Sequence, residues 1–74
     1  SYAAALDNLG ACLMGLGHYR AAHEHHRAAF EIRKATLAAD HVDLGRSYGN
    51  MARALLELRR HDEALEHIER ALAV

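Results

Sequence analysis

An internal repeat with a period of 42 residues is the feature that most restricts how this chain can fold. When the 74-residue sequence is shifted by 42 positions, 32 pairs overlap and 7 of them are identical. The identical pairs are Asn8/Asn50, Leu13/Leu55, Leu16/Leu58, Ala22/Ala64, Glu24/Glu66, His25/His67 and Ala29/Ala71. A period of this length is typical of one supersecondary unit that occurs more than once. The sequence therefore predicts two units, residues 1–40 and 41–74.

The pattern within each unit predicts a helix, a turn and a second helix. Ala, Leu, Arg and Glu favour helices, and the chain contains no Pro. Apolar residues at helical spacing predict helices over residues 2–14 and 19–38 in the first unit, and over 44–58 and 62–74 in the second. The fold class expected is all-α, with two antiparallel helix–turn–helix repeats stacked as an α-solenoid fragment.

Three short segments are expected to separate these helices. Gly15-Leu16-Gly17 ends the first helix, because Gly adopts the left-handed conformation that often closes a helix. Asp40-His41-Val42-Asp43 is expected to be a loop in which either Asp could cap the third helix. Arg59-Arg60-His61 forms the next turn.

Apolar and small residues recur at matching places in the two units. The apolar stripes are Leu6, Leu9, Leu13 and Leu16 on the first helix, and Tyr48, Met51, Leu55 and Leu58 on the third. The small residues are the pairs Gly10/Ala52, Ala22/Ala64 and Ala29/Ala71. Small side chains let two helix backbones approach closely, so these positions are expected in helix–helix contacts.

These recurring residues make the chain resemble a tetratricopeptide repeat array over nearly its whole length. The residues that carry the resemblance are Asn8-Leu9-Gly10, Leu13, Gly17, Tyr19, Ala22, Ala29 and Ile32, with the echoes Asn50-Met51-Ala52, Leu55, Ala64, Ala71 and Val74. The commonest form of that family repeats every 34 residues or so, about eight fewer than this chain. The longer period, and the segment from Asp40 to Asp43 followed by Ser47, Asn50, Met51 and Ala52, resemble the kinesin-light-chain type. The linker Pro usual in the family is absent, and Gly17 and Tyr19 are echoed by Arg59 and His61.

The resemblance implies a binding function and no chemistry of its own. Family members bind proteins, often as extended peptides, on the concave face built by the first helix of each pair. We therefore expect an interaction module of a larger scaffold or regulatory protein, not an enzyme, with no cofactor and a protein or peptide ligand as partner. The alternative is a structural, self-associating repeat spacer without a peptide ligand of its own.

Polar residues of the third helix indicate where a ligand would bind. Arg46, Asn50, Arg53 and Glu57 follow one another at steps of four, three and four residues, which places them on one helix face. The equivalent stripe in the first unit is Ala4, Asn8, Ala11 and Gly15, with Asp7 at its edge. Each Asn can donate to and accept from a peptide backbone, and the two Arg side chains attract carboxylates. The predicted partner-binding residues are Asp7, Asn8, Ala11, Arg46, Asn50, Arg53 and Glu57; the alternative is an ordinary solvated face.

Seven histidines raise the question of a metal site, most of all in the segment AHEHHR at residues 22–27. A zinc-protease helix needs His-Glu-x-x-His, and the second ligand would fall on Arg27. His23 and His26 are three residues apart on one face but need further ligands, and nothing requires Cys12 or His18 to join them. We therefore predict no metal site. We also predict no catalytic residue, because Cys12 maps onto Ala54 and is expected to be a buried, inert thiol.

The repeat register suggests ordinary places for the clustered histidines. His23 and His26 map onto Leu65 and Ile68, so both are expected to be partly buried where one helix pair meets the next. His25 maps onto His67 and is expected on the outer side of its helix.

Charge and hydropathy argue against two other classes of partner. With 9 basic and 10 acidic residues, the net charge of −1 gives no field to attract nucleic acid or a membrane surface. No apolar run approaches the roughly 20 residues of a membrane span. The single Cys fits a cytoplasmic location. The helical patterns at both ends suggest two repeats of a longer array, and exposed repeat ends could form a homo-oligomer.

Overall fold

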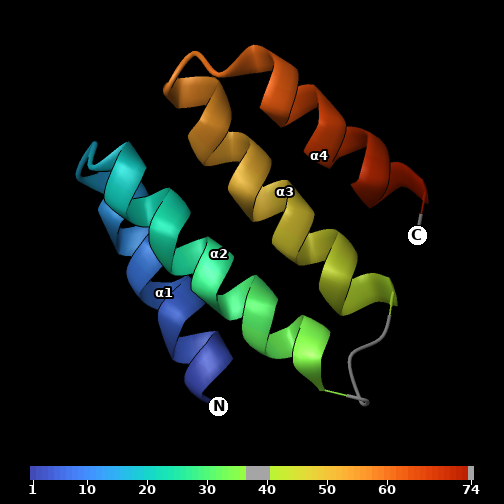
Figure 1. Ribbon diagram of the computed structural model, residues 1–74. Helices are drawn as coiled ribbons and strands as arrows, with labels where there is room; N and C mark the ends of the chain where they lie inside the picture. Colours follow the sequence, from blue (N-terminus) through green and yellow to red (C-terminus); the bar gives the residue numbers. More distant parts are fainter. Residues whose placement is uncertain (37–40, 74) are drawn as a thin grey trace.

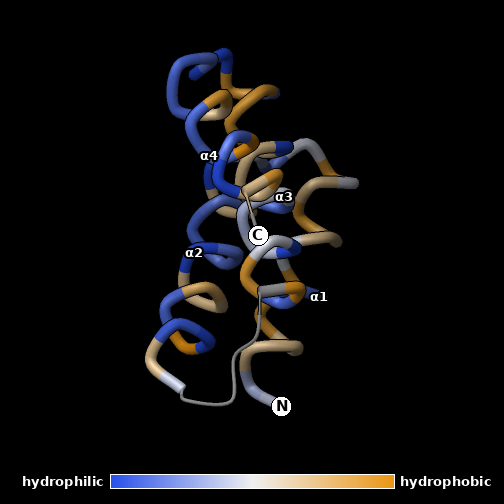
Figure 2. The backbone as a smooth tube through the Cα atoms, turned by 90° about the vertical axis from the view of Figure 1, so that its right-hand side faces the viewer, coloured by the Kyte–Doolittle hydropathy of each residue, from blue (hydrophilic) through white to orange (hydrophobic). Residues whose placement is uncertain are grey.

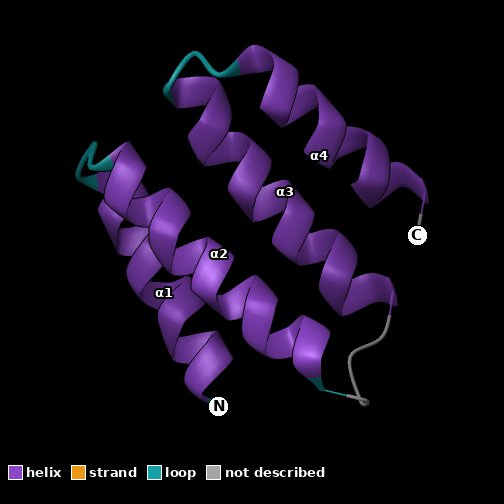
Figure 3. Ribbon diagram, viewed as in Figure 1, coloured by secondary structure: helices purple, strands orange, loops and turns teal. Residues whose placement is uncertain are grey.

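The computed structural model describes residues 1–36 and 41–73, which form four α-helices (Figure 1). The helices are α1 (Tyr2–Gly15), α2 (Tyr19–Ala35), α3 (His41–Glu57) and α4 (His61–Ala73). Within those two ranges no residue belongs to a β-strand, as Figure 3 shows. The predicted all-α fold class is confirmed.

Consecutive helices lie side by side and antiparallel, so that α2 contacts α1 and α3 while α3 contacts α2 and α4 (Figure 1). Seen from the side, α1 and α3 form one layer and α2 and α4 form the other (Figure 2). The tube of α2 is largely blue, whereas that of α1 is mostly orange and pale, so the two layers differ in polarity. The arrangement is two helix pairs stacked side by side.

The 42-residue period of the sequence is also a period of the backbone. The ends of α1 and α3, at residues 15 and 57, and the starts of α2 and α4, at residues 19 and 61, are 42 apart. Both turns contain two backbone bonds of the Schellman type. The donors and acceptors are Gly17 to Met14 at 3.1 Å and His18 to Leu13 at 2.9 Å, then Arg59 to Leu56 at 3.1 Å and Arg60 to Leu55 at 2.9 Å. The two units therefore share one turn despite their different turn sequences.

Two helix boundaries differ from the prediction. Helix α3 begins at His41, so residues 41–43 are helical, and the loop predicted there is wrong. Asp43 lies inside the first turn of α3, where the helix dipole favours a carboxylate. Helix α2 ends at Ala35 because Thr36 adopts an extended backbone with a ψ of 143°. The remainder of the predicted second helix, Asp40 and the predicted boundary between the units lie among residues outside the described range.

The core is built from alanines and a few large side chains. Phe30 of α2 packs against Tyr48 of α3 with ring centroids 4.9 Å apart, and Tyr48 meets the edge of His67 on α4 at 5.7 Å. The residues around these rings that have less than 3% of their surface exposed are Ala22, Ala29, Met51, Ala52, Ala54, Leu55 and Ala64. The predicted small positions thus include several of the closest helix contacts.

Helix α1 buries less of its apolar stripe than predicted. Leu9 is 52% exposed, whereas its counterpart Met51 is 1% exposed. The reason is that α2 covers one side of α3, and no described helix covers the matching side of α1. The same asymmetry makes the prediction for Cys12 wrong, because its thiol is exposed while Ala54 is buried.

Candidate functional site

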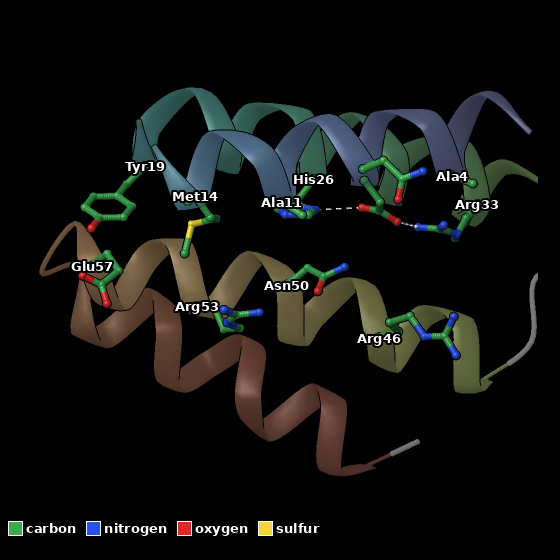
Figure 4. A pocket seen from close by; sticks show the side chains of 13 residues that line it. Ala4, Ala11, Met14, Tyr19, His26, Arg33, Arg46, Asn50, Arg53 and Glu57 are labelled. Atoms are coloured by element: carbon green, nitrogen blue, oxygen red, sulfur yellow. Dashed lines mark hydrogen bonds and ion pairs between the residues drawn. The ribbon is translucent and has the colours of Figure 1, made fainter. Parts of the chain in front are cut away.

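A groove of about 620 Å³ lies between α1 and α3 (Figure 4). Helix α1 contributes Ala4, Asp7, Asn8, Ala11, Met14 and Gly15; helix α2 contributes Tyr19, His26 and Arg33; helix α3 contributes Arg46, Asn50, Arg53 and Glu57. The groove therefore runs along the layer of first helices, across the junction between the two pairs.

All seven residues predicted to contact a partner line this groove. In Figure 4, α3 presents Glu57, Arg53, Asn50 and Arg46 in that order along the side that faces α1. Their spacing of four, three and four residues explains this line, since such steps return to the same side of a helix. The structure thus brings the predicted residues together, and their role in binding is the subject of the proposal below.

Four groove residues were missed by the sequence reasoning. Met14 and Tyr19 lie near the Glu57 end of the groove, and Arg33 lies towards the Arg46 end, with His26 in between (Figure 4). His26 and Arg33 belong to α2, which was expected to contribute nothing to the concave face. Their separation of seven residues, two helical turns, is the signal that could have placed both on the side of α2 that faces α1.

Asp7 is the centre of a polar network beneath the groove. His26 Nδ1 donates to Asp7 Oδ1 at 2.7 Å, and Arg33 forms an ion pair with the other carboxylate oxygen. Arg33 also donates to Ser47 Oγ of α3 at 3.1 Å. Since both oxygens of Asp7 are engaged within the protein, Asp7 fixes α1 against α2 and, through Arg33, against α3.

His26 is buried, with 4% of its surface exposed, but not where the sequence suggested. Its ring lies against Gly10 of α1, so closely that a Cβ at Gly10 would come within 2.7 Å of the ring. His26 therefore packs inside its own helix pair and reaches the groove, and its expected place between the two pairs is wrong. The prediction failed because its counterpart Ile68 has no partner like Asp7.

The other two clustered histidines lie on the far side of α2. His23 is half-buried beside Arg60 and His67, at the junction of the pairs where it was predicted. Burial lowers the pKa of His23, and the positive charges of Arg60, His67 and Arg27 lower it further. His25 is half-buried, and its Nδ1 donates to the carbonyl of Ala21 at 2.8 Å.

The charges in the groove leave two cations open to a ligand. Arg46 and Arg53 are exposed, and neither forms an ion pair with any side chain in residues 1–36 or 42–73. Glu57 adds one negative charge at the end that also holds Met14 and Tyr19. An occupant with carboxylates near the middle of α3 and an apolar group near Tyr19 would match this distribution.

Two other kinds of site were sought in the described ranges. There, no three His, Cys, Asp or Glu side chains converge as the ligands of a metal ion would. No helix in those ranges is long and apolar enough to span a membrane.

The geometry defines a class of protein first: an α-helical repeat protein in which antiparallel helix pairs stack in register. A family model described as "Tetratricopeptide repeat" matches residues 1–74, and the chain belongs to the tetratricopeptide repeat family. This family is a non-catalytic repeat module that generally mediates protein–protein interactions. Neither the comparison with curated proteins nor that with solved structures found a match.

Proposed function

We propose that the groove binds an extended, acidic segment of a partner protein. Asn8 and Asn50 would hold the backbone of that segment, and Arg46 and Arg53 would hold its carboxylates. The observation that carries the proposal is the pair of unpaired guanidinium groups on the groove wall, beside an Asn that recurs on both first helices.

The Asp7 network supports this assignment of charge. Because His26 and Arg33 both engage the Asp7 carboxylate, its negative charge opposes an acidic ligand less than a free carboxylate would. Glu57 stands at the far end of the line, beyond Arg53 (Figure 4). A segment with its acidic residues near Arg46 and Arg53, and an apolar residue near Met14 and Tyr19, avoids Glu57 and fills the smooth wall formed by Ala11 and Gly15.

The 42-residue period and the longer second helix favour the kinesin-light-chain type within the family. The conserved backbone period of the two units supports that subtype, since the same turn and the same helix ends recur 42 residues apart. The subtype is therefore part of the proposal, together with a place for the chain in a larger scaffold or regulatory protein.

Titration of the 74-residue chain with fluorescent peptides tests the site. The probes are extended peptides of equal length, one with two adjacent Asp residues and one apolar residue, the other with each Asp replaced by Asn. The acidic peptide should bind more tightly, and its affinity should fall at least fivefold with Asn50→Ala or Arg53→Ala. Raising the salt concentration should weaken the acidic peptide more than the neutral one.

Arg20→Ala is the matched control, because Arg20 is an exposed arginine of α2 outside the groove. It should leave the affinity unchanged. Equal binding of the acidic and neutral peptides, or an equal loss with Arg20→Ala and Arg53→Ala, would contradict the proposed site. Absence of binding to any peptide would favour the alternative, a repeat spacer without its own ligand.

A further inference from the structure

Helix α1 exposes a face that its counterpart α3 buries. The side of α3 that contacts α2 includes Met51 and Ala54, which are 1% and 0% exposed. The residues of α1 at the same register are Leu9 and Cys12, and both are exposed. Helix α1 thus presents to solvent the kind of surface that α3 packs against a preceding second helix.

Helix α4 exposes the face that its counterpart α2 buries. Phe30 of α2 is 7% exposed and packs on Tyr48, while Leu72 of α4, at the same register, is 82% exposed. Leu65 takes the place of the half-buried His23 and is 58% exposed. Helix α4 therefore presents two large leucines where α2 presents the residues that bind α3.

The contact between α2 and α3 is the template that joins these two faces. It brings a second helix of one unit against the first helix of the next, and the 42-residue register maps its two sides onto α4 and α1. A contact between α4 of one copy and α1 of another would place Leu72 against Leu6, as Phe30 lies against Tyr48. Both leucines would leave water, which stabilises association by about 25 cal/mol per Å² of apolar surface buried.

Charges along this junction also fit a second copy. In the contact between units, Arg27 of α2 lines the same hollow as Arg60 and Arg70 of α4, so three cations lie close together. At the same register, a junction between copies replaces them with Glu69, His18 and Ala28. One carboxylate then faces an imidazole, and the mutual repulsion of three guanidinium groups is absent.

We propose that this chain binds a second copy of itself head to tail, with α4 of one copy packed on α1 of the next. The two faces are different, so the contact is heterologous and leaves one face open at each end. Each added copy offers the same open faces again, and the assembly grows by further copies. The inference does not depend on any ligand of the groove.

Sedimentation equilibrium across a wide range of concentrations tests the assembly. The average mass of the unmodified chain should rise with concentration and exceed twice the monomer mass. Leu9→Glu and Leu72→Glu each place a charge on one face, and each variant alone should remain monomeric. Both positions are exposed in the folded chain, so circular dichroism should show an unchanged helix content.

Mixing the two variants is the decisive measurement. Leu9→Glu keeps an intact α4 face and Leu72→Glu keeps an intact α1 face, so the mixture should form a one-to-one complex and nothing larger. Ala73→Glu is the matched control, because its counterpart Glu31 is an exposed glutamate beside the intact contact of α2 with α3. It should assemble like the unmodified chain.

The thiol of Cys12 gives an independent readout. Its counterpart Ala54 is fully buried by α2, so assembly should slow the reaction of Cys12 with a thiol reagent at high protein concentration. The Leu72→Glu variant should react at the same rate at every concentration. An unmodified chain that stays monomeric, a mixture that does not associate, or either variant dimerising alone would overturn the proposal and leave these faces to a different partner.

Discussion

Gly17 and Arg59 occupy the same place in the two turns and share one left-handed backbone conformation, with φ angles of 81° and 63°. Gly adopts this conformation without strain, whereas an L-residue with a Cβ is disfavoured there by roughly 1–2 kcal/mol. The backbone bonds of the second turn nevertheless match those of the first. The second turn therefore keeps its shape because the helices on both sides of it are packed.

Replacing Arg59 with Gly should stabilise the chain. The strain is removed, and the greater freedom of Gly in the unfolded state offsets part of the gain, so the free energy of unfolding should rise by about 0.5–1 kcal/mol. Urea denaturation followed by circular dichroism measures this change. Arg59→Ala separates the loss of the side chain from the relief of strain and should not reproduce the gain; equal effects of the two substitutions would count against the argument.

Adding a methyl group to Gly10 should destabilise the fold. The new Cβ would come within 2.9 Å of three atoms of the buried His26 ring, so the ring or the helices must move. Overpacking of this kind costs about 1–3 kcal/mol, which urea denaturation would detect.

The control for Gly10→Ala is Gly49→Ala in α3. A Cβ at Gly49 meets nothing within 4 Å, so the same substitution there should stabilise the helix by up to about 1 kcal/mol. Opposite signs at the two glycines are the expected result. A gain in stability at both positions would show that His26 does not pack on Gly10 as described.

The groove could be predicted from the sequence because helical spacing alone decides which residues share a face. Steps of four, three and four residues align Arg46, Asn50, Arg53 and Glu57 whatever packs on the opposite side of α3. The 42-residue register then transfers that line to α1. Helix number and type followed from the same local patterns, which depend little on tertiary contacts.

Burial at the outer helices could not be predicted in the same way. The register treats Cys12 and Ala54 as equivalent, but their exposure depends on the helix that lies next to each one. The Asp7 network was missed for a related reason. Asp7 and His26 align with Gly49 and Ile68, so the network exists in one unit alone and a comparison between repeats removes it.

Asp7→Ala should destabilise the fold more than the loss of any exposed ion pair. It leaves the buried His26 without its hydrogen-bond partner and Arg33 without its carboxylate. Breaking a polar network of this burial costs about 2–4 kcal/mol. A double-mutant cycle with His26→Ala should show a coupling energy above about 0.5 kcal/mol, because the two residues are in contact.

Glu66→Ala is the matched control for Asp7→Ala. Glu66 accepts a hydrogen bond from Arg70 at 3.3 Å, and both side chains are about 60% exposed. Exposed pairs contribute less than about 1 kcal/mol, so urea denaturation should show a small change. Equal losses for the two carboxylates would show that the Asp7 network does not hold α1 and α2 together.

Acid should destabilise the chain through His23. Burial and the charges of Arg60, His67 and Arg27 lower the pKa of His23 in the folded state below the value of about 6.5 in the unfolded state. The unfolded chain therefore binds more protons below this pH, and stability falls as the pH drops through the unfolded pKa. Above roughly pH 7.5 both states hold His23 neutral, and the contribution no longer changes with pH.

Two variants test this pH dependence. His23→Leu, which introduces the residue found at the same register in α4, should make the free energy of unfolding less sensitive to pH between about 7.5 and 5.5. Arg60→Gln should raise the pKa of His23, measured by NMR titration of its ring protons, because one of the neighbouring positive charges is lost. Arg20→Gln is the control, since Arg20 is not among the charges that lower this pKa. If Arg60→Gln leaves the His23 pKa unchanged while His23→Leu still flattens the profile, burial alone lowers that pKa and the electrostatic part of the prediction is wrong.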